Sequence, residues 1–183
     1  IPVSHIPMKD VGEAIKELKR TVRLGAKAAM VGSDFIDGKT YGHQYFDPLW
    51  AEAEAMEIPI TIHPSTGKNS LLALAYPNRE DLTAWWMFVN GGENVKMNFT
   101  SLFNHGTFDK FPKLKVVVLE SGIGWIVWWL DRMDEKFEIN GFTTPMEEIP
   151  SEYFKRQGFI TMDPDERLVQ FSIDVLGADK FLW

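Results

Sequence analysis

The sequence has 183 residues, of which 45% are hydrophobic and 25% are charged, a balance typical of a globular protein with a buried core and not of a disordered or low-complexity chain. Its 19 Lys and Arg residues against 26 Asp and Glu residues leave a formal charge of −7, and no run of five basic residues occurs, so nucleic acid is not an expected partner. The absence of Cys excludes disulfide bonds, thiolate metal ligands and a cysteine nucleophile.

Short β-rich runs alternate along the chain with longer segments of helical periodicity. Strands are predicted over residues 1–4, 26–31, 58–63, 114–119 and 158–162, and a sixth begins near residue 180. Helices are predicted over residues 11–24, from 47 to about 56, over 81–103 with a break near 91–92, from 125 to about 138, and over 164–176. The segment that contains Pro145 and Pro150 is predicted to be a loop.

Two α/β architectures with parallel strands agree with this alternation. A closed (β/α)8 barrel usually needs ~250 residues, whereas an open doubly wound sheet fits the length without a missing piece. The first residue is not Met and the sequence ends at Trp183 within a predicted strand, so both ends look cut. We therefore expect a single domain over residues 1–183, an incomplete (β/α)8 barrel with about six of the eight βα units.

His63 is the first candidate for chemistry, because it ends a predicted strand directly before a Pro-Ser-Thr-Gly loop. In parallel α/β folds the C-terminal ends of the strands are where ligands and catalytic groups gather. A neutral imidazole there can bind a divalent metal through one nitrogen while a neighbouring group orients the other. From the position alone, a core histidine bonded to a backbone carbonyl is an equally good interpretation.

Glu120 follows the most apolar predicted strand and stands at the equivalent end of it. A carboxylate there needs a cation or hydrogen-bond donors, because burying an unpaired charge is costly. It is either a metal ligand, a general base or an anchor for water, or it caps the amides at the start of the next helix, residues 122–125. Asp163 ends the next strand, and we expect it to be the N-cap of the helix that follows.

Weaker candidates stand elsewhere in the chain. His105, in the loop before the fourth predicted strand, is either a catalytic contributor or structural, and His43, in a strand-to-helix loop, is a candidate substrate contact. Arg132 is a candidate for binding an anionic substrate group, although an intrahelical pair with Glu135 is favoured. Trp125 is a candidate substrate contact as well, although its spacing with neighbouring tryptophans favours core or subunit packing.

Several function classes lose support because their motifs do not occur. The sequence has no P-loop, no Gly-x-Gly-x-x-Gly fingerprint, no His-Glu-x-x-His pair and no Gly-x-Ser-x-Gly elbow, which disfavours nucleotide-dependent and serine-hydrolase chemistry. No stretch approaches ~18 uninterrupted apolar residues, so we expect no membrane partner. No signal peptide is visible, and we expect a cytoplasmic protein.

Three blocks of the sequence resemble a known family. The first runs from DPLWAEA at residues 47–53 into IPITIHP at 58–64, the second joins FDKFPKLKV at 108–116 to ESGIGW at 120–125, and the third is GADKFLW at 177–183. In this order and spacing they resemble the amidohydrolase-related proteins, the "amidohydrolase 2" group that includes aminocarboxymuconate-semialdehyde decarboxylase.

The resemblance implies a metal-dependent (β/α)8 barrel, usually carrying zinc, that performs hydrolysis or non-oxidative decarboxylation. In that family the metal is held by a His-x-His or Glu-x-His pair on the first strand, a His that ends the fifth and an Asp on the eighth. His63 matches the fifth-strand ligand, and the other ligand positions would lie before Ile1 and after Trp183. Many decarboxylases of the group have a catalytic His where Glu120 stands, so the resemblance implies either hydrolysis or an acid–base role for Glu120.

Two functions from different classes stay open. The first is an enzyme that acts on a small carboxylated substrate through a metal-activated water, with His63 as ligand, Glu120 as base or water-orienting group and His105 as a contributor. We expect this enzyme to be a homo-oligomer, and we expect the present chain alone, with one ligand of the family's four, to bind metal weakly and to be inactive. The second is a catalytically dead α/β module for binding or oligomerisation through its tryptophan-rich surface.

Overall fold

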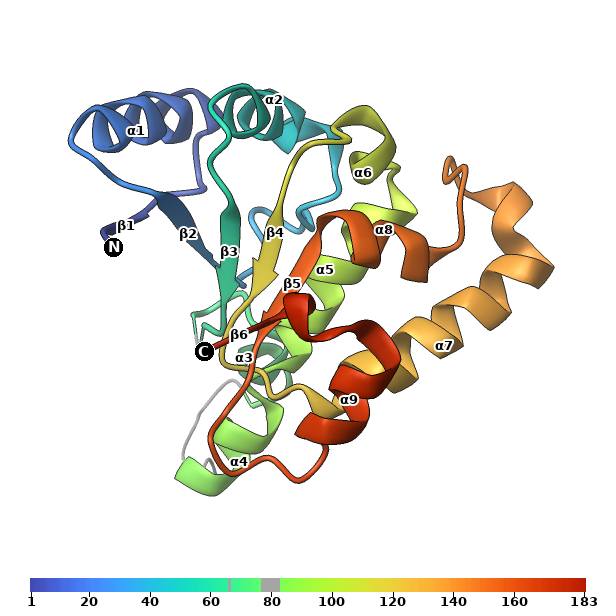
Figure 1. Cartoon of the computed structure of the whole chain (residues 1–183). Helices are drawn as coiled ribbons and strands as arrows, with labels where there is room; N and C mark the ends of the chain where they lie inside the picture. Colours follow the sequence, from blue (N-terminus) through green and yellow to red (C-terminus); the bar gives the residue numbers. More distant parts are fainter. Residues whose placement is uncertain (66, 77–82) are drawn as a thin grey trace.

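A computed structural model describes residues 1–65, 67–76 and 83–183 of the chain. In this described part six strands form one parallel sheet, and each pairs with the next one along the chain (Figure 1). The strands are β1 (Val3–His5), β2 (Ala28–Gly32), β3 (Ile60–His63), β4 (Val116–Val118), β5 (Gly158–Thr161) and β6 (Phe181–Leu182).

The order of the strands distinguishes the two predicted architectures. A doubly wound sheet reverses its strand order at a switch point, whereas the order β1-β2-β3-β4-β5-β6 contains no reversal within the described residues. A sequential parallel order with intervening helices is the winding of a (β/α)8 barrel. The predicted α/β class and barrel winding are therefore confirmed, with six strands of the barrel in the described part of the chain.

Helices alternate with the strands, and neighbouring helices pack on one another. In Figure 1 α1 lies beside α2, and α7 packs against α8 and α9. The helices are α1 (Val11–Arg23), α2 (Asp47–Ala55), α3 (Leu71–Ala75), α4 (Ala84–Asn90), α5 (Glu93–Asn104), α6 (Thr107–Lys110), α7 (Gly124–Asn140), α8 (Pro150–Gln157) and α9 (Val169–Leu176). Single 3-10 turns are η1 (Gln44–Phe46), η2 (Gly141–Thr143) and η3 (Ala178–Lys180).

Three helix boundaries test the sequence predictions. The predicted helix over residues 81–103 is broken as expected, into α4 and α5, and its residues 81 and 82 lie outside the described residues. The helix predicted from residue 164 begins only at Val169, after a stretch of turns. The predicted loop with Pro150 contains α8, because the fixed φ of proline suits the first position of a helix and does not only interrupt one.

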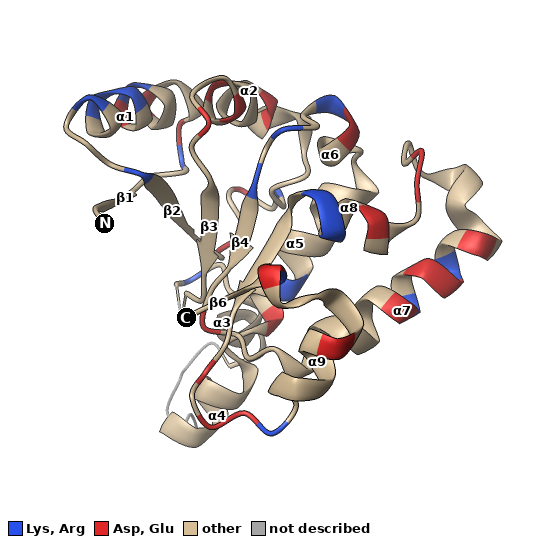
Figure 2. Ribbon diagram, viewed as in Figure 1, with Lys and Arg blue, Asp and Glu red and all other residues tan. Residues whose placement is uncertain are grey.

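The core lies between the sheet and the helices that cover it. Ile60 and Ile62 of β3 are almost fully buried in the hydrophobic cluster, which also contains Trp50 of α2 and Leu102 of α5. Because side chains alternate along a strand, His63 points to the face opposite Ile60 and Ile62. Figure 2 shows the charged residues on helices and loops, with both signs along α1 and α7, while β2 and β3 carry none. None of the described helices combines the length and the apolar character needed to cross a bilayer.

Candidate metal and acid–base site

His63 is the last residue of β3, and its side chain is 34% exposed. The Nδ1 atom lies 2.8 Å from the carbonyl oxygen of Pro64. A carbonyl oxygen only accepts hydrogen bonds, so Nδ1 donates, and in the neutral ring Nε2 carries the lone pair. The bond to a backbone carbonyl that was considered from sequence is therefore present, and it leaves the other nitrogen with a lone pair directed away from it. The role of metal ligand stays a prediction.

Glu120 lies two residues beyond the end of β4, and its Oε1 atom is 3.3 Å from Nε2 of His63. The imidazole lone pair and a carboxylate oxygen are both hydrogen-bond acceptors, so they repel at this distance unless a proton or a cation lies between them. The Glu120 side chain is 70% exposed, which leaves its carboxylate open to solvent. The ends of β3 and β4 thus bring one nitrogen and one oxygen, each with a lone pair, close to the same point.

The backbone of Glu120 adopts an unfavourable conformation at this point. Its φ is +44°, in the left-handed region that a residue with a Cβ enters only at a cost. The amide of Glu120 donates to Oγ1 of Thr161, at the end of β5, over 3.1 Å. Strain of this kind persists where the surrounding structure enforces it, and it clusters at functional sites.

Glu166, which the sequence analysis did not single out, performs the capping that was considered for Glu120. Its carboxylate accepts from the amide of Ile123 at 2.6 Å and from the amide of Asp163 at 2.9 Å. The prediction that Asp163 is a helix N-cap is wrong, because α9 begins only after Leu168. Because Glu166 accepts from the Ile123 amide at the start of α7, the carboxylate of Glu120 is free to approach His63.

A pocket of about 610 Å³ opens beside Glu120. Exposed Phe88 and Val89 of α4 form an apolar part of its wall, and Trp125 at the start of α7 forms another. The remaining lining residues are polar or small: Gly92, Glu93, Lys96, Ser121, Gly122 and Asp163. His63 is not part of this lining and meets the pocket through its contact with Glu120. Apolar surface and the carboxylate of Glu120 therefore line the same pocket.

A buried polar network holds the neighbouring end of β2. The carbonyl oxygen of Ser33 accepts from Nδ2 of Asn94 at 3.1 Å and from Nδ2 of Asn98 at 2.7 Å, and all three residues are almost fully buried. Tyr41 donates its hydroxyl proton to the carbonyl of Gly32, and burial, reinforced by the charge of Asp34, raises the pKa of Tyr41. Sequence reasoning missed this network, although two asparagines four residues apart on a helix with an apolar face are a signal for it.

The structure does not bring the other two predicted histidines to this site. His105 is the C-cap of α5, whose first residue, Glu93, lines the pocket beside Glu120. A helix of 12 residues is about 18 Å long, so His105 lies that far from the pocket end of α5. There it stands 6.4 Å, between ring centroids, from His43, and burial together with the charge of His43 lowers the pKa of His105.

Arg132 and the wider ligand set complete the account of the predicted residues. Arg132 lies on α7 and pairs with Glu135 at 3.5 Å, which is the intrahelical pair favoured from sequence. Within residues 1–65, 67–76 and 83–183 no group of three His, Asp or Glu side chains is close enough to hold a metal ion. His63 and Glu120 bring together one nitrogen and one oxygen of the types that bind divalent cations, and they do not by themselves enclose a cation.

Comparison with known proteins gives consistent results. The Amidohydrolase family model matches residues 1–183. The chain is similar to the gamma-resorcylate decarboxylase of Polaromonas sp. (strain JS666 / ATCC BAA-500), with 27% identity over 194 residues, 97% of this chain and 56% of that enzyme. The chain spans about half the length of the curated relatives it matches.

Solved structures show the same winding. A 5-carboxyvanillate decarboxylase from Sphingomonas paucimobilis superimposes with a TM-score of 0.80 at 25% identity, over 99% of this chain and 54% of that one. A dihydroxybenzoic acid decarboxylase from Polaromonas sp. JS666, with bound manganese and the inhibitor 2-nitroresorcinol, gives a TM-score of 0.75 at 24% identity, over 97% of this chain and 55% of that one. The parallel α/β fold assigned above is therefore shared with these proteins.

Proposed function

The chain belongs to the amidohydrolase family, and on that premise we propose that it supplies His63 and Glu120 to a divalent-metal site that decarboxylates a small aromatic acid without oxidation. The observation that carries the proposal is the 3.3 Å approach of Nε2 of His63 to Oε1 of Glu120. The relatives named above support the substrate class, because they are called decarboxylases of gamma-resorcylate, 5-carboxyvanillate and dihydroxybenzoic acid.

In this proposal His63 is a metal ligand through Nε2, and the carbonyl of Pro64 holds the ring in the required tautomer. When bound, the metal acts as a Lewis acid that polarises an oxygen of the substrate. Manganese is the metal named with the dihydroxybenzoic acid decarboxylase, so zinc and the cytoplasmic location stay predictions of the sequence analysis.

Glu120 is the proposed acid–base group. Decarboxylation breaks the bond between a ring carbon and its carboxylate, releases CO2 and requires one proton on the ring carbon. A protonated Glu120 delivers that proton, becomes a carboxylate and is reprotonated from solvent, to which 70% of its side chain is open. Phe88, Val89 and Trp125 would accommodate the aromatic ring in the adjoining pocket.

Hydrolysis is the second candidate, and the observation that favours it is the chemistry of Glu120 itself. A carboxylate beside a metal ligand is suited to accept a proton from an attacking water. Decarboxylation starts from a protonated Glu120, and hydrolysis starts from its carboxylate. The position of the side chain is the same in both, so the product formed distinguishes the two reactions.

The test is CO2 release from 2,6-dihydroxybenzoate and from 5-carboxyvanillate by the full-length protein, loaded with Mn²⁺ or with Zn²⁺. We expect release by the unmodified protein, and we expect Glu120→Gln to lower it by at least about a hundredfold, as loss of a general acid or base does. His63→Gln should lower both CO2 release and the bound metal, because it removes the proposed metal ligand. Glu57→Gln is the matched control, since Glu57 is also an exposed glutamate with positive φ, +54°, and lies at the end of α2.

Three outcomes would overturn the proposal in different ways. Cleavage of an amide or ester panel without CO2 release would replace decarboxylation by hydrolysis. Stoichiometric metal that survives His63→Gln would remove His63 from the site. A metal-free, inactive full-length protein that self-associates would favour the binding or oligomerisation module, to whose surface exposed Trp128 would belong.

A further inference from the structure

The carbonyl that orients His63 belongs to a peptide unit held from its other side. The bond between Pro64 and Ser65 joins the Pro64 carbonyl, which accepts from Nδ1 of His63 at 2.8 Å, to the Ser65 amide. That amide donates to Oγ of Ser33 at 2.9 Å. A peptide unit is planar and rigid, so fixing the direction of its N–H also fixes the direction of its C=O.

Ser33 is well suited to hold this peptide unit. Its side chain is fully buried at the end of β2, and its own carbonyl is held by the asparagines of α5 at 3.1 and 2.7 Å. The backbone of Ser33 is therefore fixed by α5, and its hydroxyl oxygen contacts both the amide and the hydroxyl of Ser65, at 2.9 and 3.3 Å.

Asp34 adds a second attachment to the same loop. Ser65 donates its hydroxyl proton to Oδ1 of Asp34 at 2.7 Å. A Cβ on Gly67 would lie 1.5 Å from Oδ2 of Asp34, so only glycine lets the chain pass this close to the carboxylate. The loop after β3 is thus held at Ser65 by two side chains of the β2 end.

From these contacts we propose that Ser33, assisted by Asp34, is a positioning residue for His63. It holds the Pro64–Ser65 peptide so that the carbonyl selects the Nδ1–H tautomer and leaves the Nε2 lone pair facing Glu120. This inference rests on the proposed function for its purpose, because the tautomer matters only if Nε2 binds a metal. It assigns a task to two residues whose described hydrogen bonds go to neither His63 nor Glu120.

The experiment reads the tautomer directly in the metal-free 183-residue chain. Long-range ¹H–¹⁵N correlation spectra at a fixed pH of about 8, where an unperturbed imidazole is neutral, distinguish Nδ1–H from Nε2–H. The chain has four histidines, so the spectrum of His63→Gln assigns the His63 signals by difference. We expect His63 to be mainly Nδ1–H in the unmodified chain and a mixture of both tautomers in Ser33→Ala.

Two further variants keep the inference falsifiable. Ser65→Ala removes the bond to Asp34 and the 3.3 Å contact between the hydroxyls of Ser65 and Ser33, but it keeps the bond from the Ser65 amide to Ser33. It should therefore give a smaller change of tautomer in the same direction, and it is the variant to use if Ser33→Ala does not fold. Asp37→Asn is the matched control, since this exposed carboxylate of the same segment is absent from the network and Asn tolerates its φ of +50°. An unchanged tautomer in both serine variants, or an equal change in Asp37→Asn, would overturn the inference.

Zn²⁺ titration separates this inference from the proposed function. If both hold, Ser33→Ala weakens Zn²⁺ binding at Nε2 of His63 by about tenfold or more, the loss typical when a ligand's orienting partner is removed. If the tautomer responds as expected but His63 of the full-length protein does not respond to Zn²⁺, the positioning role stands and the proposed metal site is wrong. If Zn²⁺ binds His63 equally well in the unmodified protein and in Ser33→Ala, and His63 has the same tautomer in both, the positioning role is wrong and the metal site stands.

Discussion

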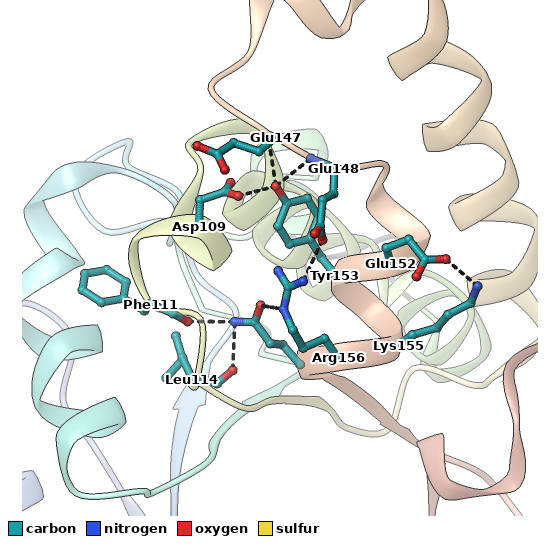
Figure 3. A network of polar contacts seen from close by, with 10 residues as sticks. Asp109, Phe111, Leu114, Glu147, Glu148, Glu152, Tyr153, Lys155 and Arg156 are labelled. Atoms are coloured by element: carbon teal, nitrogen blue, oxygen red, sulfur yellow. Dashed lines mark hydrogen bonds and ion pairs between the residues drawn. The ribbon is translucent and has the colours of Figure 1, made fainter.

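The two edges of the sheet use polar side chains in opposite ways. At the edge where the strands begin, α8 leads directly into β5, and Tyr153 of this helix is fully buried. Its hydroxyl donates to Asp109 of α6 and accepts from the amides of Glu147 at 2.8 Å and Glu148 at 3.1 Å (Figure 3). One donor and two acceptor positions are all that a hydroxyl has, so this group is saturated.

The same edge contains a second fully buried polar side chain, which has three partners, one of them Nε of Arg156, which donates to it at 3.1 Å. Gln157, at the end of α8, donates to the carbonyls of Phe111 at 2.8 Å and Leu114 at 3.2 Å, just before β4 begins. Arg156 lies with its guanidinium 5.1 Å from the ring of Tyr153 and pairs with Glu148 at 2.7 Å (Figure 3). These bonds connect α8 to α6, to the segment before α8 and to the loop before β4.

At the opposite edge, where the strands end, two polar side chains have atoms that are not saturated by hydrogen bonds. His63 and Glu120 direct two acceptor atoms at one another across 3.3 Å, and the carboxylate is largely exposed. A saturated buried hydroxyl such as that of Tyr153 contributes to stability, whereas acceptors that face each other are useful only to a proton or a cation. The Tyr153 contacts thus serve stability, whereas at the opposite edge a buried network at the end of β2 stands beside the pair that is open to a proton or a cation. Active sites in barrels of this type usually lie at this second edge.

The largest expected effect is on stability and tests the saturated edge. Tyr153→Phe leaves the carboxylate of Asp109 and two amides without their partner, so the free energy of unfolding should fall by about 2–3 kcal/mol. Urea unfolding at neutral pH measures it, with an unchanged m-value as the sign of an unchanged unfolding reaction. The site at the other edge should keep its Zn²⁺ response.

Tyr45→Phe is the control for this substitution. The Tyr45 hydroxyl also bonds the backbone, at Lys9 and Val11, but its side chain is 37% exposed and water can replace it. Its loss should cost less than about 1 kcal/mol. Equal losses of unfolding free energy in Tyr153→Phe and Tyr45→Phe would show that burial of the Tyr153 hydroxyl does not strengthen its contribution to stability.

The second expected effect is a loss of stability at alkaline pH. Burial, together with the hydrogen bond to Asp109, raises the pKa of Tyr153 to about 12, above the usual value of a tyrosine. The neutral phenol is therefore favoured in the folded state, so its contribution is complete below pH 10 and is lost as the pH rises towards about 12. The loss is on the order of 2 kcal/mol.

Comparison with Tyr153→Phe isolates this effect from the other groups that titrate in the same range. The stability difference between the unmodified chain and the variant should shrink between pH 10 and about 12, measured by urea unfolding at several pH values. A difference that stays constant over this range would show that the phenol ionises as it does in the unfolded chain.

The sequence predicted the contact at the chemical edge, because a rule of topology was enough for it. Parallel strands have their C-terminal ends at one edge, so two polar residues that end neighbouring strands must lie close together. His63 and Glu120 obey this rule. His105 does not, since its distance from the site depends on where α5 starts and on the length of that helix.

The supporting contacts were not predictable in this way. The bond from Ser65 to Ser33 spans 32 residues, and the bonds from the two asparagines of α5 to Ser33 span 61 and 65. The spacing of the two asparagines signals a buried polar contact but does not identify its partner, because the partner depends on how the loops and α5 pack once the sheet has formed. The role of Glu166 as the partner of the Ile123 amide was hidden for the same reason, at a separation of 43 residues.

The smallest expected effect is a gain in stability, and it tests whether the chemical edge retains strain. Glu120 and Glu57 both have positive φ, +44° and +54°, one at each edge of the sheet. Glycine adopts this conformation without the cost of a Cβ, although it also makes the unfolded chain more flexible. Glu57→Gly and Glu120→Gly should therefore each raise the free energy of unfolding by about 0.5–1 kcal/mol.

The pair of variants separates strain from function. Glu57 follows α2, at a position where glycine is common after a helix, so its replacement should leave the Zn²⁺ response and CO2 release unchanged. Replacement of Glu120 should abolish CO2 release while the protein becomes more stable, as expected where a strained residue is kept for its side chain. If Glu120→Gly instead lowers the stability, its carboxylate holds the strand ends together, and the division between a stable edge and a chemical edge is wrong.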